Sequence, residues 1–176
     1  MKERTYYEEK NIENIKKLRE LEKELPSYVT TFFRGIEPHT ASRTRIAYAY
    51  DLGIFFEYIK ENNPLYADKE VTDFPLEILD QITALDIEEY LEYLSYYVKD
   101  NSEHQNTERG KMRKLASLRT LYNYYYRKEM IKTNPASIVS MPKIHQKEIV
   151  RLDIDEVARL LDEVEQGDNL TKREQN

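Results

Sequence analysis

Residues 109–143 read RGKMRKLASLRTLYNYYYRKEMIKTNPASIVSMPK, and this stretch decides the fold class of the chain. Helix-favouring residues fill it without a proline as far as Asn134-Pro135, where a helix has to end. Apolar and aromatic side chains recur there at helical spacing, namely Met112, Leu115, Leu118, Tyr122, Tyr125 and Tyr126. The pattern predicts a long amphipathic helix over residues 107–131 that buries these side chains.

The same helical signal covers most of the chain. Further helices are predicted over residues 1–25, 27–33, 84–99 and 152–165, and one from Thr40 or Ser42, as the N-cap, to residue 62. Thr83 with Asp86 approximates a capping box at the start of 84–99. Residues 63–83 are predicted to be a connector with at most a short helix, and residues 101–106 a polar loop. We therefore expect an all-α protein, a small bundle of four to five main helices.

Two apolar stripes predict which helix faces are buried. In the helix ending at residue 62 the predicted buried side chains are Ile46, Tyr50, Ile54, Phe55 and Tyr58. In the leading helix they are Ile12, Ile15, Leu18, Leu21 and Leu25. The leading stripe fits either a dimer contact or packing on its own domain, and we favour packing.

A change of character after Pro142 indicates how the chain is divided. Residues 1–38 are predicted to form an N-terminal helical extension and residues 39–142 a helical domain. Residues 143–151 are basic and are typical of a linker. Residues 152–176 hold one amphipathic helix and a polar tail, and are predicted to be the beginning of a second, truncated domain.

Composition excludes several function classes. The chain has 176 residues and no cysteine, which excludes disulfides, iron–sulfur clusters, thiolate zinc sites and a cysteine nucleophile. None of its four glycines lies two positions from another, so a glycine-rich phosphate loop is excluded. No apolar run approaches the ~18 residues of a membrane span, and the start MKERTYYEEK has no signal-peptide core. We expect a soluble, cytoplasmic protein without a metal or other cofactor.

Charge is distributed unevenly along the chain. The net charge is −6, with 27 basic and 33 acidic side chains, which argues against an acidic partner. Residues 104–151, however, hold 11 basic and 3 acidic side chains, a net of +8, and leave −14 for the rest. The net charge of the whole chain therefore hides a basic region.

The basic residues fall at specific positions on the predicted helices. On the outer face of the 107–131 helix lie Arg109, Arg113, Ser117, Thr120, Tyr124 and Arg127, with Lys114 at the flank. A second cluster, at the start of the helix ending at residue 62, holds Thr40, Ser42, Arg43, Thr44 and Arg45, and the linker adds Lys143 and Lys147. Cations interspersed with hydroxyls suit a phosphate backbone, whereas the alternative is an ordinary solvated face.

Four segments carry a resemblance to a known family. TASRTRIAYAYDLGIFFEYIKEN (40–62), ALDIEEYLEYL (84–94) and the stretch 109–143 are similar, in this order, to the core-binding domain of the tyrosine recombinases, the phage-integrase and Xer family. LDIDEVARLLDEVEQG (152–167) resembles the first helix of that family's catalytic domain. ELPSYV (24–29) resembles the Xer variants of Gram-positive bacteria.

The resemblance implies a SAM-like core-binding domain that contacts DNA during site-specific strand exchange, in DNA integration or chromosome-dimer resolution. Carried over to this sequence, the DNA-facing residues are Thr40, Ser42, Arg43, Thr44, Arg109, Arg113, Lys114 and Ser117. The expected partners are double-stranded DNA and, in a synaptic complex, other recombinase protomers, with no membrane and no small-molecule ligand.

The resemblance stops before the family's catalytic residues. No His-x-x-Arg pair occurs, because the third residue after each of His39, His104 and His145 is not arginine. The fifteen tyrosines are interpreted as core and surface residues, since a nucleophilic tyrosine needs surrounding arginines or a metal to activate the phosphate. We expect a chain that binds DNA and does not cleave it. The alternative is a helical protein-interaction module.

Overall fold

Six α-helices make up most of the structure, a computed structural model that describes residues 4–144. They are α1 (Tyr6–Glu22), α2 (Ser27–Ile36), α3 (Ser42–Asn62), α4 (Ile78–Gln81), α5 (Ala84–Tyr93) and α6 (Glu108–Arg127). A two-stranded antiparallel hairpin, β1 (Tyr97–Lys99) and β2 (Ser102–His104), lies between α5 and α6, with Tyr97 opposite His104. The prediction of a small all-α bundle is confirmed. The predicted 152–165 helix, Lys147 and most of the linker lie outside the described residues.

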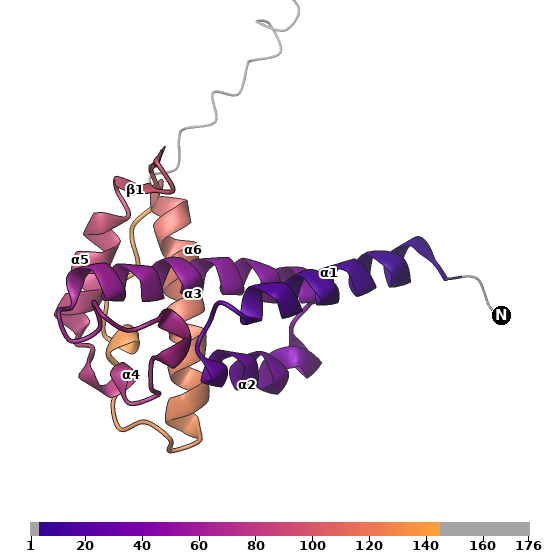
Figure 1. Cartoon of the computed structure of the whole chain (residues 1–176), viewed down its shortest axis with the longest axis horizontal. Helices are drawn as coiled ribbons and strands as arrows, with labels where there is room; N and C mark the ends of the chain where they lie inside the picture. The colour runs from indigo at the N-terminus through magenta and orange to yellow at the C-terminus, as the bar shows by residue number, and fades with distance from the viewer. Residues whose placement is uncertain (1–3, 145–176) are drawn as a thin grey trace, which may run out of the picture. The chain divides into compact units, whose positions relative to one another are not determined.

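The core lies where α2, α3, α5 and α6 meet (Figure 1). In the view of Figure 1, α3 crosses α6, and α1 lies along α3. Large apolar side chains from these helices are almost completely buried, for example Phe32, Leu52, Phe56 and Leu118. Burial of side chains of this size stabilises a fold by ~1.5–3 kcal/mol each.

Several tyrosines belong to this core. Tyr90, Tyr122 and Tyr125 are completely buried. The Tyr122 hydroxyl donates a hydrogen bond to the Leu79 carbonyl at 2.9 Å, and the Tyr125 hydroxyl donates to the Tyr28 carbonyl. These bonds tie α6 to α4 and α2, which explains how polar side chains can lie in the core.

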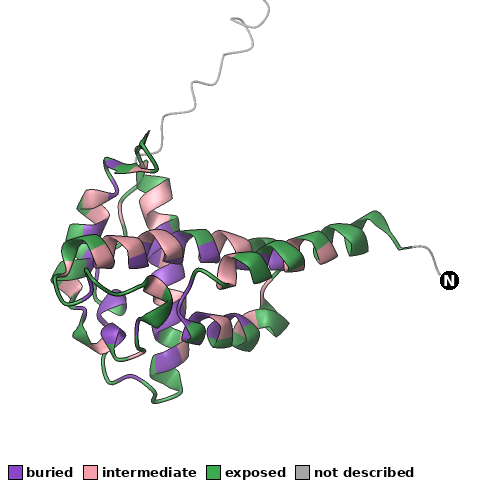
Figure 2. Cartoon of the chain, in the orientation of Figure 1, coloured by how far each residue is buried: buried purple, intermediate pink, exposed green. Residues whose placement is uncertain are grey.

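The leading helix α1 packs on its own domain along α3. Leu18 is buried in the common core, and the Ser42 hydroxyl at the start of α3 donates a hydrogen bond to Asn11 Oδ1 at 2.7 Å. Asn14 Nδ2 donates to the same hydroxyl at 3.3 Å. Figure 2 shows that the burial is confined to one end of α1, while its N-terminal end is exposed. The packing interpretation of the leading stripe is confirmed.

The helix starts agree with the sequence at one place and differ at another. Thr83 and Asp86 form the predicted capping box, in which the Asp86 amide donates to Thr83 Oγ1 at 3.2 Å and the Thr83 amide donates to Asp86 Oδ2 at 2.7 Å. Helix α3 runs from Ser42 to Asn62, as predicted, but its N-cap is Ala41, without a side-chain bond, so the expectation of Thr40 or Ser42 as the cap is wrong. Ser42 instead uses its hydroxyl to hold α1.

The segment between α5 and α6 differs most from the prediction. A helix to residue 99 and a loop over 101–106 were expected, but α5 ends at Tyr93 and the hairpin follows. Asp100 and Asn101 occupy the turn with φ of 51° and 59°, a left-handed conformation that aspartate and asparagine tolerate and that two-residue hairpin turns require. The connector 63–83 does contain only short turns and α4, as expected.

Two tyrosines predicted to be buried are exposed. Tyr50 on α3 and Tyr126 on α6 are both 48% exposed. The buried side of α3 is formed by Ala49, Leu52, Phe55, Phe56 and Ile59, so the predicted face was rotated around the helix. Helix α6 also ends at Arg127 rather than at residue 131, because Glu129 turns the chain with a φ of 56°.

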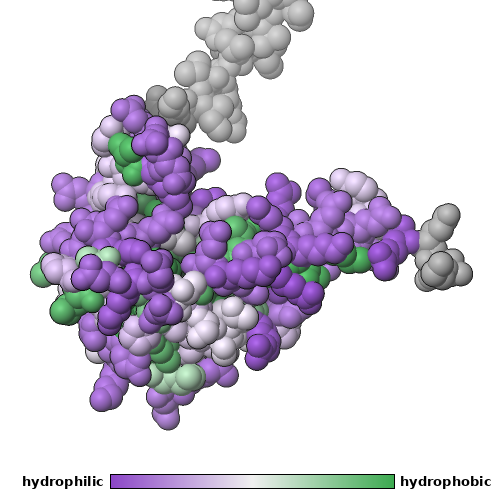
Figure 3. Space-filling view, in the orientation of Figure 1, coloured by the Kyte–Doolittle hydropathy of each residue, from purple (hydrophilic) through white to green (hydrophobic). Residues whose placement is uncertain are grey.

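The surface is predominantly hydrophilic on the face shown in Figure 3, with small scattered apolar areas. Within the described part of the chain, no helix combines the length and the apolar character needed to cross a bilayer.

Candidate nucleic-acid interface

Four of the predicted site residues form one surface line along α6. Arg109, Arg113, Thr120 and Arg127 lie at spacings of four and seven residues, which keeps them within a narrow arc of the helix. The arginines are exposed, and Thr120 is half-buried with its hydroxyl donating to the Ala116 carbonyl at 2.9 Å. At 1.5 Å per residue the line is about 27 Å long. We call these four residues the basic strip.

Two residues predicted for this outer face lie inside the protein. Lys114 is 5% exposed, with its ammonium group 3.7 Å from the Asp51 carboxylate. Ser117 is completely buried, and its hydroxyl donates to the Lys114 carbonyl at 2.8 Å. Their prediction as surface residues is wrong because both lie on the side of α6 that packs on the core.

Tyr124 is half-buried at the end of the strip. Its ring makes an edge-to-face contact with Phe32, with ring centres 5.5 Å apart, and Lys128 Nζ lies 5.1 Å from the ring centre. The lysine and the ring form a cation–π pair of the kind that occurs at exposed sites. Contact of Tyr124 with DNA remains a prediction.

The start of α3 supplies a second exposed group. Arg43 and Thr44 are exposed, and Thr40 is half-buried just before the helix. Ser42 and Arg45 are each 7% exposed, and Arg45 Nη1 lies 3.9 Å from the Glu37 carboxylate. The expectation that Ser42 and Arg45 face outward is therefore wrong. The Ser42 hydroxyl bonds to α1, and the Arg45 guanidinium pairs with Glu37.

Two contacts locate the start of α3 relative to the basic strip. Gly35, at the end of α2, lies against the Tyr124 ring, and Asp51, in the middle of α3, contacts Arg113. The end of α2 and the middle of α3 are therefore each packed against α6. Thr44 lies two helical turns before Asp51 on the same face of α3. The start of α3 therefore lies ~10 Å along the helix from the Asp51–Arg113 contact.

Not all of the positive charge counted in the sequence is available at the surface. Lys111 Nζ lies 3.6 Å from the Glu108 carboxylate. Arg119 Nε donates to the Ala136 carbonyl at 2.9 Å, and its Nη2 donates to the Val139 carbonyl. Arg119 thus holds the segment after α6 against the helix. Lys143 is exposed near the end of the described residues.

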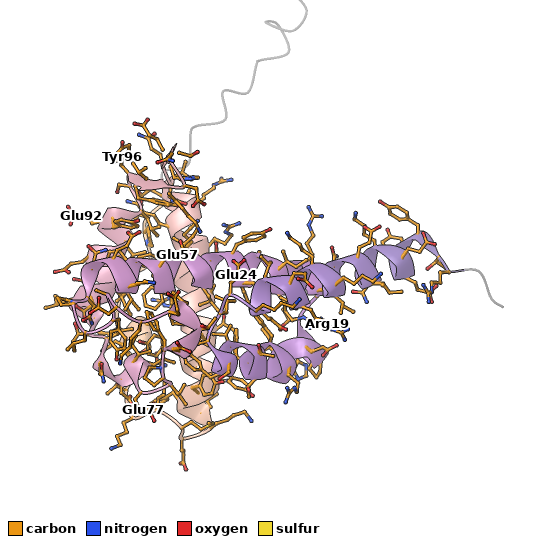
Figure 4. The ribbon with its side chains drawn as sticks, in the orientation of Figure 1. Arg19, Glu24, Glu57, Glu77, Glu92 and Tyr96 are labelled. Carbon is orange, nitrogen blue, oxygen red and sulfur yellow. The ribbon has the colours of Figure 1, made fainter. Side chains whose placement is uncertain are left out.

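Acidic side chains lie on other elements. The labels in Figure 4 mark Glu24 after α1, Glu57 on α3 and Glu92 on α5. Glu57 pairs with Lys99 of the hairpin at 2.8 Å. Helix α6 itself carries a single acid, Glu108. Helix α6 therefore contributes little of the negative charge itself.

Sequence reasoning missed the residues that organise this surface. Asp51 and Asn106 hold the cations of α6 but lie 62 and 8 residues away from their partners, and no local pattern marks them. Lys128 was counted as a basic residue, but its contact with the Tyr124 ring was not predicted. The two residues are four apart at the end of α6, a spacing that could have indicated the contact.

The arrangement can hold an anionic polymer. Guanidinium groups along one line can donate hydrogen bonds to phosphate oxygens, a kind of contact that positions a duplex without reading its sequence. Among residues 4–144, no three histidine or carboxylate side chains gather to hold a metal ion.

Comparison with curated proteins finds tyrosine recombinases. The chain is 30% identical over 126 residues to "Tyrosine recombinase XerC" of Caldanaerobacter subterraneus subsp. tengcongensis. The aligned region covers 68% of this chain and 34% of that protein. It is 32% identical over 127 residues to the protein of the same name from Leptospira interrogans serogroup Icterohaemorrhagiae serovar copenhageni, covering 72% and 35%. It carries a Xer-like tyrosine recombinase N-terminal region.

This recombinase region is also 26% identical over 112 residues to "Tyrosine recombinase XerC" of Anoxybacillus flavithermus, covering 64% of the chain and 31% of that protein. The chain spans about a third of the length of the curated relatives it matches. No protein-family model matches it, and no solved structure gives a significant match.

Proposed function

We propose that this recombinase region binds double-stranded DNA through the basic strip of α6 and the start of α3. The observation that carries the proposal is the line of exposed arginines on α6, in a chain whose relatives are tyrosine recombinases. Residues 39–142 would be the core-binding, SAM-like domain of a site-specific recombinase acting in DNA integration or chromosome-dimer resolution. Residues 1–38 would be its helical extension and residues 143–151 the linker.

Each exposed residue has a definite role in the proposal. Arg109, Arg113 and Arg127 contact phosphates along about 27 Å of the duplex. Arg43 and Thr44, exposed at the start of α3, contact a further part of the DNA backbone. Tyr124, Thr40 and Lys143 lie at the margins of this surface, whereas Lys114, Ser117, Ser42 and Arg45 act inside the protein.

The proposal assigns DNA binding, and no cleavage, to residues 4–144. Tyrosine recombination needs arginines around the scissile phosphate, and the sequence contains no His-x-x-Arg pair. Cleavage would be supplied by other parts of a full-length recombinase, and its other protomers would be the protein partners. Incubation of this chain with DNA should yield no covalent adduct on a denaturing gel.

The first test of the proposal compares two charge reversals of equal size. The double variant Arg109→Glu/Arg127→Glu changes the strip, and Lys16→Glu/Arg19→Glu makes the same change on α1. Fluorescence anisotropy of a labelled duplex at low salt should show at least a tenfold loss of affinity for the strip variant and a change of less than about threefold for the control. Far-UV circular dichroism checks that both variants remain folded.

Salt dependence provides a second measurement. If the three strip arginines and Arg43 each displace a phosphate counterion, the logarithm of the association constant should fall with the logarithm of salt concentration with a slope of about −3.6. Equal losses in the two charge-reversal variants, or binding without salt dependence, would contradict the proposal. Absence of any DNA binding would favour the protein-interaction module.

A further inference from the structure

A completely buried carboxylate lies in the middle of α3. Asp51 has no exposed side-chain surface, and its Oδ1 accepts a hydrogen bond from Arg113 Nη2 at 2.8 Å. Lys114 Nζ lies 3.7 Å from the same oxygen. Asp51 Oδ2 and the nearby buried Tyr90 hydroxyl have no hydrogen-bond partner within residues 4–144. Burying a carboxylate is costly, and the adjacent Arg113 and Lys114 side chains compensate that cost.

Lys114 is fixed from the opposite side by the loop that precedes α6. Its ammonium group donates to Asn106 Oδ1 at 2.8 Å, and the Asn106 backbone amide and Nδ2 both donate to the Leu94 carbonyl, at 3.0 and 3.2 Å. A Cβ at Gly110 would lie 2.9 Å from Asn106 Oδ1, so glycine allows this close approach. Lys114 therefore anchors the start of α6 to the end of α5 and is not available to an outside ligand.

Burial governs the charges in this cluster. It raises the pKa of Asp51, an effect that the neighbouring Arg113 and Lys114 oppose. Burial likewise lowers the pKa of the Lys114 ammonium group, and Asp51 opposes that change. The charged states of Asp51 and the two cations therefore stabilise one another. Lys114 is held inside the protein, so Arg113 is the member of this cluster that is exposed at the surface.

Arg113 contacts the buried carboxylate and is also exposed to solvent. Its side chain is 56% exposed while one of its nitrogens bonds to Asp51. A guanidinium carries five N–H donors in a rigid plane, so it can bond to a buried carboxylate and to an external phosphate at once. A lysine at this position would carry its three donors on one nitrogen, so the buried carboxylate and the phosphate would both have to lie within hydrogen-bond distance of that single atom.

We propose that Asp51 is a positioning residue for DNA binding, which holds the Arg113 guanidinium in the orientation that receives a phosphate. The inference rests on the proposed function and adds a buried residue that never touches DNA. By ordering Arg113 before binding, Asp51 removes the entropy cost of immobilising one long side chain, which corresponds to about a fivefold gain in affinity.

The sign of one substitution separates positioning from simple electrostatics. Asp51→Asn removes a negative charge close to the strip, so charge alone predicts tighter DNA binding. Positioning predicts weaker binding, by about fivefold, because the guanidinium loses its charged anchor. The effect should vanish in an Arg113→Ala background, where nothing remains to be positioned, whereas a general structural defect would persist there.

A conservative substitution tests the same idea without touching the buried carboxylate. Arg113→Lys should lose about fivefold in affinity for a labelled duplex, since donors on one nitrogen do not span a buried carboxylate and an outer phosphate as the planar guanidinium does. Arg127→Lys is the matched comparison, because it keeps the charge of a strip arginine for which the structure records no ion pair among residues 4–144, and its loss of affinity should be clearly smaller than that of Arg113→Lys. This pair decides the question even if Asp51→Asn does not fold.

The outcomes distinguish the inference from the proposed function. Unchanged or tighter binding by folded Asp51→Asn, an Asp51→Asn loss that persists with Arg113→Ala, or equal behaviour of Arg113→Lys and Arg127→Lys, would overturn the positioning role. In each case a loss of affinity in Arg109→Glu/Arg127→Glu would leave the proposed function standing. If that charge-reversal variant also bound normally, the proposed function itself would fail.

Discussion

Replacing Gly35 by alanine should destabilise the protein, although the same change stabilises most helices. Gly35 lies near the end of α2, where helix propensity alone favours alanine by ~0.5–1 kcal/mol. A Cβ at this position would overlap the Tyr124 ring, for example at 2.5 Å from Cζ. The ring would have to move out of the space between α2 and α6.

The cost follows from the contacts that the Tyr124 ring would lose. It makes edge-to-face contacts with Phe32 and Tyr125, at 5.5 and 5.0 Å between ring centres, and a cation–π contact with Lys128 at 5.1 Å. Loss of two aromatic pairs and an exposed cation–π pair costs ~1.5–4 kcal/mol. After subtraction of the propensity gain, Gly35→Ala should lower the free energy of unfolding by ~1–3 kcal/mol.

Urea unfolding followed by far-UV circular dichroism measures this free energy directly. The decisive control repeats Gly35→Ala in a Tyr124→Ala background, where the new methyl group has space. There the substitution should stabilise the protein by ~0.5–1 kcal/mol. The reasoning would be refuted if Gly35→Ala stabilised the wild-type chain, or if its cost were the same in both backgrounds.

Three further substitutions test side-chain hydrogen bonds. Tyr122→Phe leaves the buried Leu79 carbonyl without its donor and should cost ~1–3 kcal/mol of unfolding free energy in urea. Thr83→Ala removes the cap of α5 and should cost ~1 kcal/mol in the same assay. Burial would raise the pKa of Asp80, but hydrogen bonds from the backbone amides and hydroxyl of residues 132–133 outweigh it and lower the pKa. The ionised Asp80 side chain therefore stabilises the fold at pH values above the ordinary aspartate pKa, and this stabilisation is lost as the pH falls through the lowered pKa. In acid titrations, Asp80→Asn should weaken the dependence of the free energy of unfolding on pH.

Exposed residues of the same types serve as controls. Tyr126→Phe and Asp68→Asn change surface side chains and should alter the free energy of unfolding by less than about 0.5 kcal/mol. A cost for Tyr126→Phe as large as that for Tyr122→Phe would show that the hydroxyl bond to α4 is not what matters. An acid-unfolding profile of Asp80→Asn that matched the wild type would remove Asp80 from the acid dependence.

Local signals in the sequence predicted local structure. Thr83 with Asp86 marked the start of α5, and Asn134-Pro135 lay beyond the end of α6. The hairpin was missed because its strands have three residues each, too few for an alternating pattern, and the Asp100-Asn101 turn was the remaining signal. A strand pair this short depends on its packing beside α5 and α6 more than on propensity.

The candidate site was predictable in part. The spacing of Arg109, Arg113 and Arg127 placed them correctly on the outside of α6. The burial of Lys114 was not predictable, because it depends on Asp51, which is distant in sequence, and hydrophobic periodicity treats every lysine as exposed. The predicted burial of Tyr50 and Tyr126 was wrong for a different reason, because a tyrosine side chain is compatible with both a core and a surface position.

The buried tyrosines set an alkaline limit on the fold. Burial raises the pKa of Tyr28, Tyr90 and Tyr122 above the ordinary value, so these phenols keep their protons in the folded protein and release them on unfolding. Above about pH 10 each of them should lower the free energy of unfolding by ~1.4 kcal/mol per pH unit. Because the chain has no tryptophan, the absorbance of ionised tyrosine near the ultraviolet edge would report this unfolding directly, as a late and cooperative step after the exposed phenols have titrated.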